Sequence, residues 1–272
     1  MLYDTGRLPM RVRMAIYLAD PNALLRPASN DSDEAVARLV KVSKDGDVDS
    51  DFLRAGVVKV FADGVMEYPA QTAALLKPYL DENGKPTKHS GELYFDPQRF
   101  ARLVQKLDAA GLAVHVHAIG DRAVRASLDA FAAARAANGD KDNRHQIAHL
   151  RLVDPADFPR FKELGVIADM QLEWAKREPA TEGPPEPYLG LERYKYVYPA
   201  GSLHRAGATI IGGSDWDISS YNPFRAFQTA VTRAGDKGQR PLNIDERIPL
   251  ETAIDDHQCL VRHEAGQDDR QP

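Results

Sequence analysis

The chain has 272 residues, of which 43% are hydrophobic, and this is enough for one large domain with a sizeable core. Its formal net charge is −5, and it has no dense run of Lys and Arg with interleaved aromatic residues, so neither a nucleic acid nor an anionic membrane is the expected partner. The single cysteine, Cys259, excludes an intramolecular disulfide and a thiolate zinc cluster, which leaves His, Asp, Glu and modified Lys as candidate metal ligands.

No apolar run approaches the roughly 20 residues that span a bilayer, and the amino terminus lacks the order of a signal peptide. We therefore expect a soluble, cytoplasmic protein that acts on a small molecule. The chain opens almost directly on a strand-like segment, so we also expect that an upstream region is missing.

Short β-branched runs alternate with longer helical patterns, which predicts βα units and a parallel sheet. The predicted strands are residues 10–18, 57–62, 112–117, 145–149, 166–170 and 208–212. Helix starts are marked by a capping residue before proline, at Asp96-Pro97, Asp154-Pro155 and Asn222-Pro223. Helix ends are marked by Gly111, Gly165 and Gly207.

Two turn-rich segments, 65–94 and 172–200, each follow a predicted strand. Loops of this length at the carboxyl ends of parallel strands are usually lids or binding loops, so we expect the active site there. We expect one domain over residues 1–256, followed by a polar, poorly ordered tail over residues 257–272.

Candidate chemistry begins with His115 and His117, which lie two apart on a predicted strand and so point to one face. Taken alone, such a pair is as well explained by a buried histidine that is bonded to a backbone carbonyl. The next strand ends in His149, with His145 four residues earlier, and Asp215 follows the last strand after a Gly-Gly pair.

Lys59 lies in the middle of an apolar run, where a lysine needs a partner or an exit to solvent, and Asp63 is the nearest acidic candidate. Lys59, His117, His149 and Asp215 together follow the order of a hydrolytic metal centre with one or two divalent ions, for which Zn²⁺ is the best match. Asp215 is then the catalytic residue that takes a proton from the nucleophilic water and returns it to a leaving amine.

Several separate motifs resemble one known family. They are VKVFADG, HVHAIGDRAV, IAHL followed by DPADFPRFKELGVIADMQ, and GGSDW followed by NPF. In this order they are similar to the amidohydrolase superfamily, in the subgroup called amidohydrolase family 3, whose known members include N-substituted formamide deformylases. The resemblance runs from about residue 7 to about residue 255, and it implies a TIM-type (β/α)₈ barrel that hydrolyses C–N bonds in amides, formamides or cyclic ureides.

The resemblance also implies roles for single residues. Lys59 matches the lysine that is carboxylated to bridge two metal ions, His117 and His149 match the ligands of the fifth and sixth strands, and Asp215 matches the aspartate of the eighth. His115 is expected beside the metal or facing the substrate, and Asp121 is expected to cap the following helix. The remaining residues expected to line the pocket or support the ligands are His145, Asp63, Trp216 and Trp174.

The chain departs from the family pattern because no histidine precedes Lys59, so the first-strand His-x-His pair is absent. We expect an incomplete barrel with strands three to eight present and strands one and two missing, and its exposed edges favour association into a homo-oligomer. A smaller complete barrel in which HVH is the first-strand pair is the alternative arrangement.

The sequence therefore predicts a metal-dependent hydrolase of C–N bonds. Two alternatives stay open at this point. One is a catalytically inactive truncated remnant without the first-strand ligands, and the other is a metal-free aldolase in which Lys59 forms a Schiff base.

Overall fold

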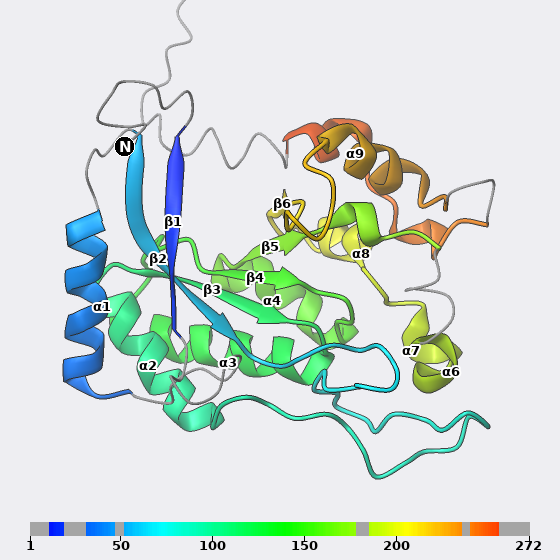
Figure 1. The fold of residues 1–272 in the computed structure, drawn as a ribbon, viewed down its shortest axis with the longest axis horizontal. Coiled ribbons are helices and arrows are strands. Elements are labelled where there is room, and N and C mark those ends of the chain that lie inside the picture. Colours follow the sequence, from blue (N-terminus) through cyan, green and yellow to red (C-terminus); the bar gives the residue numbers. More distant parts are fainter. Residues whose placement is uncertain (1–10, 19–30, 47–51, 178–184, 236–239, 256–272) are drawn as a thin grey trace, which may run out of the picture.

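A computed structural model of the protein describes residues 11–18, 31–46, 52–177, 185–235 and 240–255. Its centre is one sheet of six parallel strands whose order in space follows their order in the sequence (Figure 1). The strands are β1 Val12–Tyr17, β2 Leu53–Phe61, β3 Ala113–Ala118, β4 Gln146–His149, β5 Ile167–Met170 and β6 Ile210–Gly212. All six strands predicted from the sequence are therefore confirmed.

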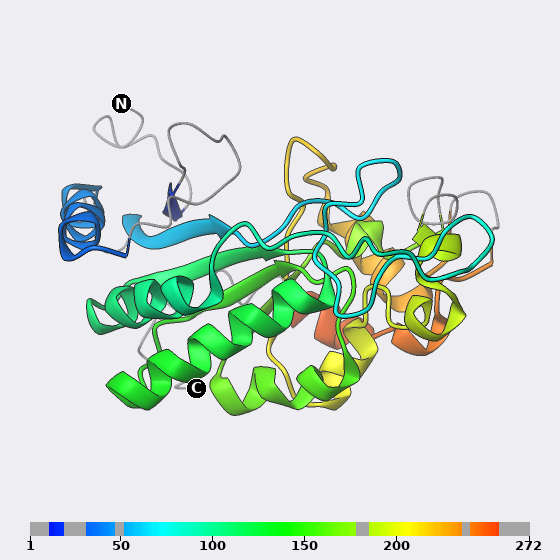
Figure 2. The ribbon, with the colours of Figure 1, turned by 90° about the horizontal axis from the view of Figure 1, so that it is seen from below.

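The larger helices are α1 Asp33–Gly46, α2 Pro97–Ala109, α3 Asp121–Asn138, α4 Phe158–Leu164, α8 Ala200–Arg205 and α9 Pro223–Thr232. Figure 2 shows α2, α3 and α4 side by side along one face of the sheet. Sequential strand order with these helices on one face is the winding of an α/β barrel wall, whereas a doubly wound sheet has helices on both faces. The assignment of these strands as numbers three to eight of a barrel stays a prediction.

Shorter helical turns lie in the connections: η1 Pro155–Asp157, η2 Leu172–Trp174, α6 Pro185–Leu189, α7 Leu191–Tyr194 and η4 Ile244–Glu246. Two helical features differ from the sequence prediction. Helix α1 was not among the predicted elements, although its sequence is amphipathic and buries Val36 and Leu39. Helices α6 and α7 fall inside 172–200, where proline and glycine indicated a continuous loop.

The predicted helix caps are confirmed. Asp96 accepts a hydrogen bond from Arg99 N at 2.9 Å, and Asp154 and Asn222 cap the turns that follow them in the same way. The three glycines expected at helix ends, Gly111, Gly165 and Gly207, have φ of 78°, 67° and 78°. This left-handed conformation costs glycine little, which is why the sequence signal was reliable.

The core lies between the sheet and the helices. Val58 and Val60 of β2 and Val114 and Val116 of β3 are fully buried on the helix side of the sheet. Burying one such side chain contributes roughly 1.5–3 kcal/mol, so this layer is the main source of stability. Strand β1 is different, because four of its six residues are exposed, as expected for a strand at the edge of the sheet.

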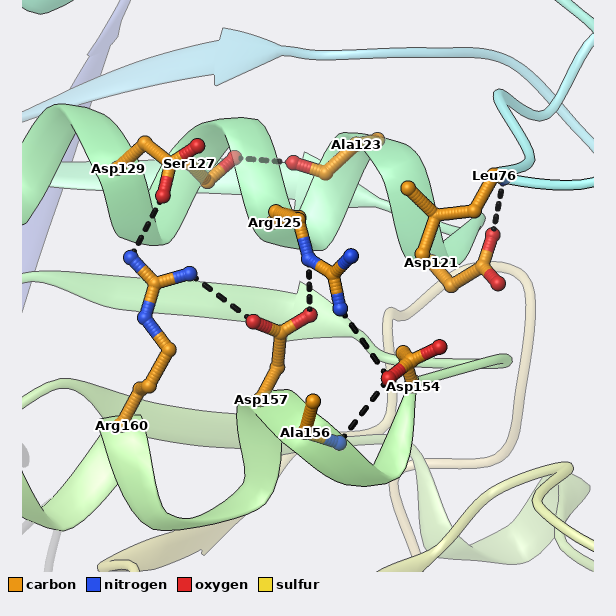
Figure 3. Close-up of polar contacts among 10 residues, drawn as sticks. All are labelled: Leu76, Asp121, Ala123, Arg125, Ser127, Asp129, Asp154, Ala156, Asp157 and Arg160. Atoms are coloured by element: carbon orange, nitrogen blue, oxygen red, sulfur yellow. Dashed lines mark hydrogen bonds and ion pairs between the residues drawn. The ribbon is translucent and has the colours of Figure 1, made fainter.

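A buried carboxylate ties α3 to the segment that precedes β5. Asp157 accepts from Arg125 Nε and from Arg160 Nη1, each at 2.9 Å, and it is almost fully buried (Figure 3). Arg125 also contacts Asp154 at 3.1 Å, and Arg160 also contacts Asp129 at 2.6 Å. Both guanidinium groups are thus shared between two carboxylates, which holds α3 and α4 at one relative position.

The long segment after β2 is anchored to the sheet by Asp63. Its carboxylate accepts three backbone N–H groups, from Ala74, Ile119 and Gly120, each at 2.9 Å. Burial raises the pKa of Asp63 to about 7, although these three hydrogen bonds act in the opposite direction. The segment is therefore held against the turn between β3 and α3 from its first residues onward.

The role predicted for Asp121 is wrong. Gly120 is the N-cap of α3, and the Asp121 carboxylate instead accepts a hydrogen bond from Leu76 N at 2.8 Å. Asp121 is the first residue of the helix, one position too late to be its N-cap, and its side chain points at the long segment. It is a second anchor of that segment.

A further helical turn follows Pro249, over residues 250–255. The predicted tail, residues 257–272, lies outside the described residues. None of the helices that the structure describes is both long enough and apolar enough to cross a membrane.

Candidate active site

A cavity of about 740 Å³ opens at the carboxyl ends of the strands. Four of the residues that line it come from strand ends: Lys59, His117, His149 and Asp215. The two long segments supply Glu67, Trp174 and Tyr198 among others. The four residues that the sequence pointed to are therefore brought together in one wall.

The two imidazoles lie against each other. The rings of His117 and His149 have centroids 4.6 Å apart and are inclined by 67°. His117 Nε2 lies 3.0 Å from the carbonyl oxygen of Gly64, to which it donates if that nitrogen carries the proton. Its Nδ1 is then left with the lone pair, which is the arrangement of a metal-binding histidine held by a backbone carbonyl.

Burial keeps both imidazoles neutral. It lowers the pKa of His117 to about 4 and lowers the pKa of His149 well below its usual value, and the charge of Lys59 acts in the same direction on both. His149 Nδ1 is buried and has no hydrogen-bond partner among the described residues. A neutral imidazole with an uncommitted nitrogen is a metal ligand or a hydrogen-bonding group for a substrate.

Backbone conformation, and not strand alternation alone, turns two of these side chains into the cavity. His149 is in register with Ala118, whose neighbours Val116 and Val114 face the helices, so a regular strand would direct His149 to that side. Its φ of 78°, followed by 49° at Leu150, redirects the chain. Asp215 has a φ of 51°. Such values in residues other than glycine cost about 1–3 kcal/mol and cluster at functional sites.

Lys59 and Asp215 form the charged part of the wall. Burial lowers the pKa of Lys59, and the carboxylates of Asp169 and Asp215 oppose that effect. Burial raises the pKa of Asp215, whereas Lys59 lowers it. Contrary to one sequence interpretation, the lysine does not depend on Asp63, whose oxygens are taken by backbone N–H groups.

The donor set suits a divalent ion such as zinc, because neutral imidazoles, a carboxylate and a lysine line one cavity, and the buried Nδ1 of His149 has no hydrogen-bond partner among the described residues. Within the described residues, however, no three His, Cys, Asp or Glu side chains are grouped closely enough to hold an ion. The four residues expected as metal ligands therefore line the same cavity, but their side chains are not close enough together to coordinate one ion.

The other candidates are distributed around this wall. His115 lies one layer below the cavity, with Nε2 3.3 Å from Asp169 Oδ2. His145 is not part of the site: it precedes β4, at the opposite edge of the sheet, where it stacks on Phe131 and bonds Asp108 at 3.0 Å. Residues four apart share a face of a strand but lie at its two ends, and this separates His145 from His149.

Asp63 lies behind His117, 3.7 Å from its Nε2, and does not line the cavity. Trp216 projects outward and is 71% exposed, so its predicted place in the pocket is wrong, because the turn that aims Asp215 inward directs the next side chain away. Trp174 does line the cavity and stacks on His149, as the sequence indicated.

Sequence reasoning missed two groups. Asp169 is a buried acid in β5, and its signal was an aspartate inside a strand that is otherwise apolar. The second group is a pair of ion pairs in the cavity wall, Arg151 with Glu67 and Arg225 with Glu173. The two partners of each pair lie more than 50 residues apart in the sequence, so no local pattern marked them.

The strands are parallel and follow one another in sequence order, and His, Lys and Asp side chains gather at their carboxyl ends. This arrangement is typical of enzymes with an α/β-barrel fold. The sequence profile of the Amidohydrolase family matches residues 1–256, and the chain therefore belongs to that family.

Relatives agree with this assignment. Protein LONG AFTER FAR-RED 3 of Arabidopsis thaliana is 32% identical over 186 residues, which cover 68% of this chain and 31% of that protein. N-substituted formamide deformylase of Arthrobacter pascens is 24% identical over 182 residues, covering 65% and 32%. The crystal structure of an uncharacterized metal-dependent hydrolase from Pyrococcus furiosus superposes with a TM-score of 0.70 at 26% identity, covering 94% of this chain and 46% of that one. The chain thus spans about a third of these curated relatives and under half of the solved structure.

Proposed function

We propose that this chain carries the site of a metal-dependent hydrolase that cleaves a C–N bond in an amide, a formamide or a cyclic ureide. The observation that carries the proposal is the convergence of Lys59, His117, His149 and Asp215 on one cavity. Family membership and the solved metal-dependent hydrolase support the hydrolase class, and the name of one relative, a formamide deformylase, supports the bond type.

His117 and His149 are the proposed imidazole ligands, with Asp215 and a carboxylated Lys59 as the oxygen ligands. Carboxylation joins the neutral Lys59 amine to carbon dioxide with loss of one proton, and the burial that lowers the pKa of Lys59 favours the neutral amine. A bound divalent ion, zinc in this proposal, supplies a water of lowered pKa and polarises the substrate carbonyl.

Asp215 moves the proton in the proposed reaction. Its carboxylate takes a proton from the attacking water and returns it to the leaving nitrogen, and a pKa raised by burial suits a group that must hold the proton between the two steps. Trp174 and Tyr198 add aromatic surface to the cavity wall. The apolar part of the wall favours a substrate with an apolar substituent.

Two measurements test the proposal. Zinc retained after dialysis, with hydrolysis of formamides or amides that Asp215→Asn lowers about 10²- to 10⁴-fold, supports it. Full activity of the Asp215→Asn variant would contradict the proposed role of Asp215 in proton transfer. For zinc binding, His149→Phe is compared with His145→Phe: we expect only the first to weaken it, because His145 lies at the other edge of the sheet.

The alternative is a chain that keeps the fold and has lost activity. The absence of a grouped ligand set among the described residues favours it. A folded chain that takes up no zinc at about 1 mM and hydrolyses none of the amides tested would select this alternative.

A further inference from the structure

Arg225 lines the cavity from the first turn of α9, the helix that begins at Pro223. Its side chain is 52% exposed, so the guanidinium lies where the cavity opens to solvent. The first turn of α9 contains no acidic residue, and a cation there opposes the helix dipole, which favours negative charge at the start of a helix. Helix stability therefore gives no reason for an arginine at this position.

One ion pair orients the guanidinium. Arg225 Nε lies 2.8 Å from Oε1 of Glu173, which is only 9% exposed. Burying a carboxylate is costly unless it is paired, and Arg225 supplies the pairing. Among the described residues, the structure gives Nη1 and Nη2 of Arg225 no partner. Since a guanidinium carries five N–H donors, both Nη groups remain for a second anion.

The second arginine of the cavity, Arg151, is placed differently. It is 4% exposed and pairs with Glu67, and its Cζ lies 5.8 Å from the centre of the Tyr198 ring. The charge of Arg151 is therefore met inside the wall. Of the two arginines, Arg225 is the one that a ligand entering from solvent contacts first.

The cavity outside the four proposed metal ligands is lined by more positive than negative side chains. Among the described residues that line it, three are cations and two are carboxylates: Arg151, Lys176, Arg225, Glu67 and Glu173. The formal charge of the whole chain is −5, so this positive lining is a local feature and not a property of the surface at large. It favours an anionic ligand.

Trp174 connects Arg225 to the proposed metal ligands. Its indole stacks on His149, and in the sequence it directly follows Glu173, the partner of Arg225. Glu173 and Trp174 both belong to η2, which packs against α9. An aromatic surface therefore extends from the imidazoles toward the guanidinium.

We propose that Arg225 is a specificity-determining residue, which binds a carboxylate on the substituent of the substrate, away from the C–N bond that is cleaved. This rests on the proposed function and names its substrate class: amides or formamides that carry an acid beyond an apolar spacer. The two Nη groups present parallel N–H donors that match the two oxygens of a carboxylate. Because the contact is the same in substrate and transition state, it should lower KM and leave kcat unchanged.

The test compares two formamides of the same shape, 4-(formamidomethyl)benzoate and 4-(formamidomethyl)benzamide, of which only the first is charged. The unmodified chain should hydrolyse the acid with a kcat/KM at least about 10-fold higher, since hydrogen bonds to a charged group contribute about 10- to 100-fold. Arg225→Gln should bring the ratio of the two kcat/KM values to about 1, mainly through a higher KM for the acid. Arg225→Lys keeps the charge without the paired donors, so it should give an intermediate ratio, and it serves if Arg225→Gln does not fold.

Arg205 provides a matched control. Its side chain is 56% exposed and faces the buried Glu246, as Arg225 faces Glu173, but it belongs to α8 and does not line the cavity. Arg205→Gln should leave the kcat/KM values for both formamides within about twofold. A fall in the ratio that Arg225→Gln causes and Arg205→Gln does not is therefore a property of the cavity.

The proposal is overturned if the unmodified chain hydrolyses the two formamides equally well, or if Arg225→Gln and Arg205→Gln change the ratio alike; in both cases the proposed hydrolase function stands. If the chain hydrolyses neither compound, the failure is that of the proposed function. The two intact compounds then still decide the role of Arg225 by isothermal titration. The acid should bind about 10-fold more tightly than the amide, and Arg225→Gln should abolish the difference, whereas equal binding to the unmodified chain overturns the proposal.

Discussion

The indole of Trp174 lies nearly parallel to the imidazole of His149, with ring centroids 5.7 Å apart and planes inclined by 9°. Trp174 also donates from Nε1 to Ser219 Oγ, a residue of the loop after β6. One side chain therefore links the end of β4 to the loop that follows Asp215, and it covers a face of an imidazole that the proposed metal site uses.

Replacing Trp174 should separate stacking from hydrogen bonding. Trp174→Phe keeps a ring over His149 and loses the bond to Ser219, so we expect zinc affinity within about threefold of the unmodified chain. Trp174→Ala frees the His149 ring, and we expect a loss of about 10-fold. Isothermal titration with zinc chloride checks both. Equal losses in the two variants would mean that the hydrogen bond, and not the stacking, orients His149.

Asp63→Ala should destabilise the protein by about 3–5 kcal/mol, because three buried backbone N–H groups lose their acceptor together. Urea unfolding measures the change. Asp81→Ala is the control: this half-buried loop residue also accepts backbone N–H groups, from Asn83 and Lys85, in solvent-exposed hydrogen bonds, and its loss should cost about 1 kcal/mol. Similar costs for both variants would contradict the role of burial.

Asp157→Ala should cost about 2 kcal/mol by removing two charge-assisted hydrogen bonds, one from Arg125 of α3 and one from Arg160 of α4. Arg125 and Arg160 each keep a second carboxylate, so the loss should be smaller than for an isolated buried pair. Hydrogen exchange should show faster opening of α4 while β2 and β3 stay protected. Uniform acceleration across the sheet would show that the network supports the whole domain.

The ion pairs of Asp31 should make the stability of the protein depend on pH. Its carboxylate contacts Arg102 and Arg99, and the hydrogen bond from Arg102 is the main reason that its pKa falls from 3.8 to about 2. An acid with a lowered folded pKa stabilises the fold above its unfolded pKa and loses that contribution as the pH falls toward the folded value.

We therefore expect Asp31→Asn to melt below the unmodified protein at about pH 6, and we expect the difference to shrink between about pH 4 and pH 2. Thermal melts followed by circular dichroism at a series of pH values check this. Asp45→Asn is a suitable control, because Asp45 pairs with Lys41 on the exposed face of α1. A difference for Asp31→Asn that is constant with pH would contradict the ion-pair origin.

Local signals were sufficient for most of the fold. The six strands, the caps at Asp96, Asp154 and Asn222, and the glycines at helix ends each depend on a few neighbouring residues, and all are confirmed. Helix α1 was missed although its sequence is amphipathic, and the proline-rich composition of 172–200 hid α6 and α7. The second error arises where tertiary packing outweighs local preference.

The candidate site was foreseen in part. Lys59, His117, His149 and Asp215 do meet at one cavity, since parallel strands bring their carboxyl ends to one edge of the sheet. The same reasoning misplaced His145 and Trp216, because it followed residue order and ignored strand length and the turn after β6.

The sequence by itself determined the six strands, the capped and glycine-terminated helices and the residue types that end each strand, because those choices depend on periodicity and capping over a few residues. Only the tertiary structure decided that His149 turns into the cavity through a positive φ, and that Asp169 comes to lie beside His115. Both depend on the register of strands distant in sequence and on backbone strain that the surrounding packing must hold, and neither leaves a local pattern in the chain.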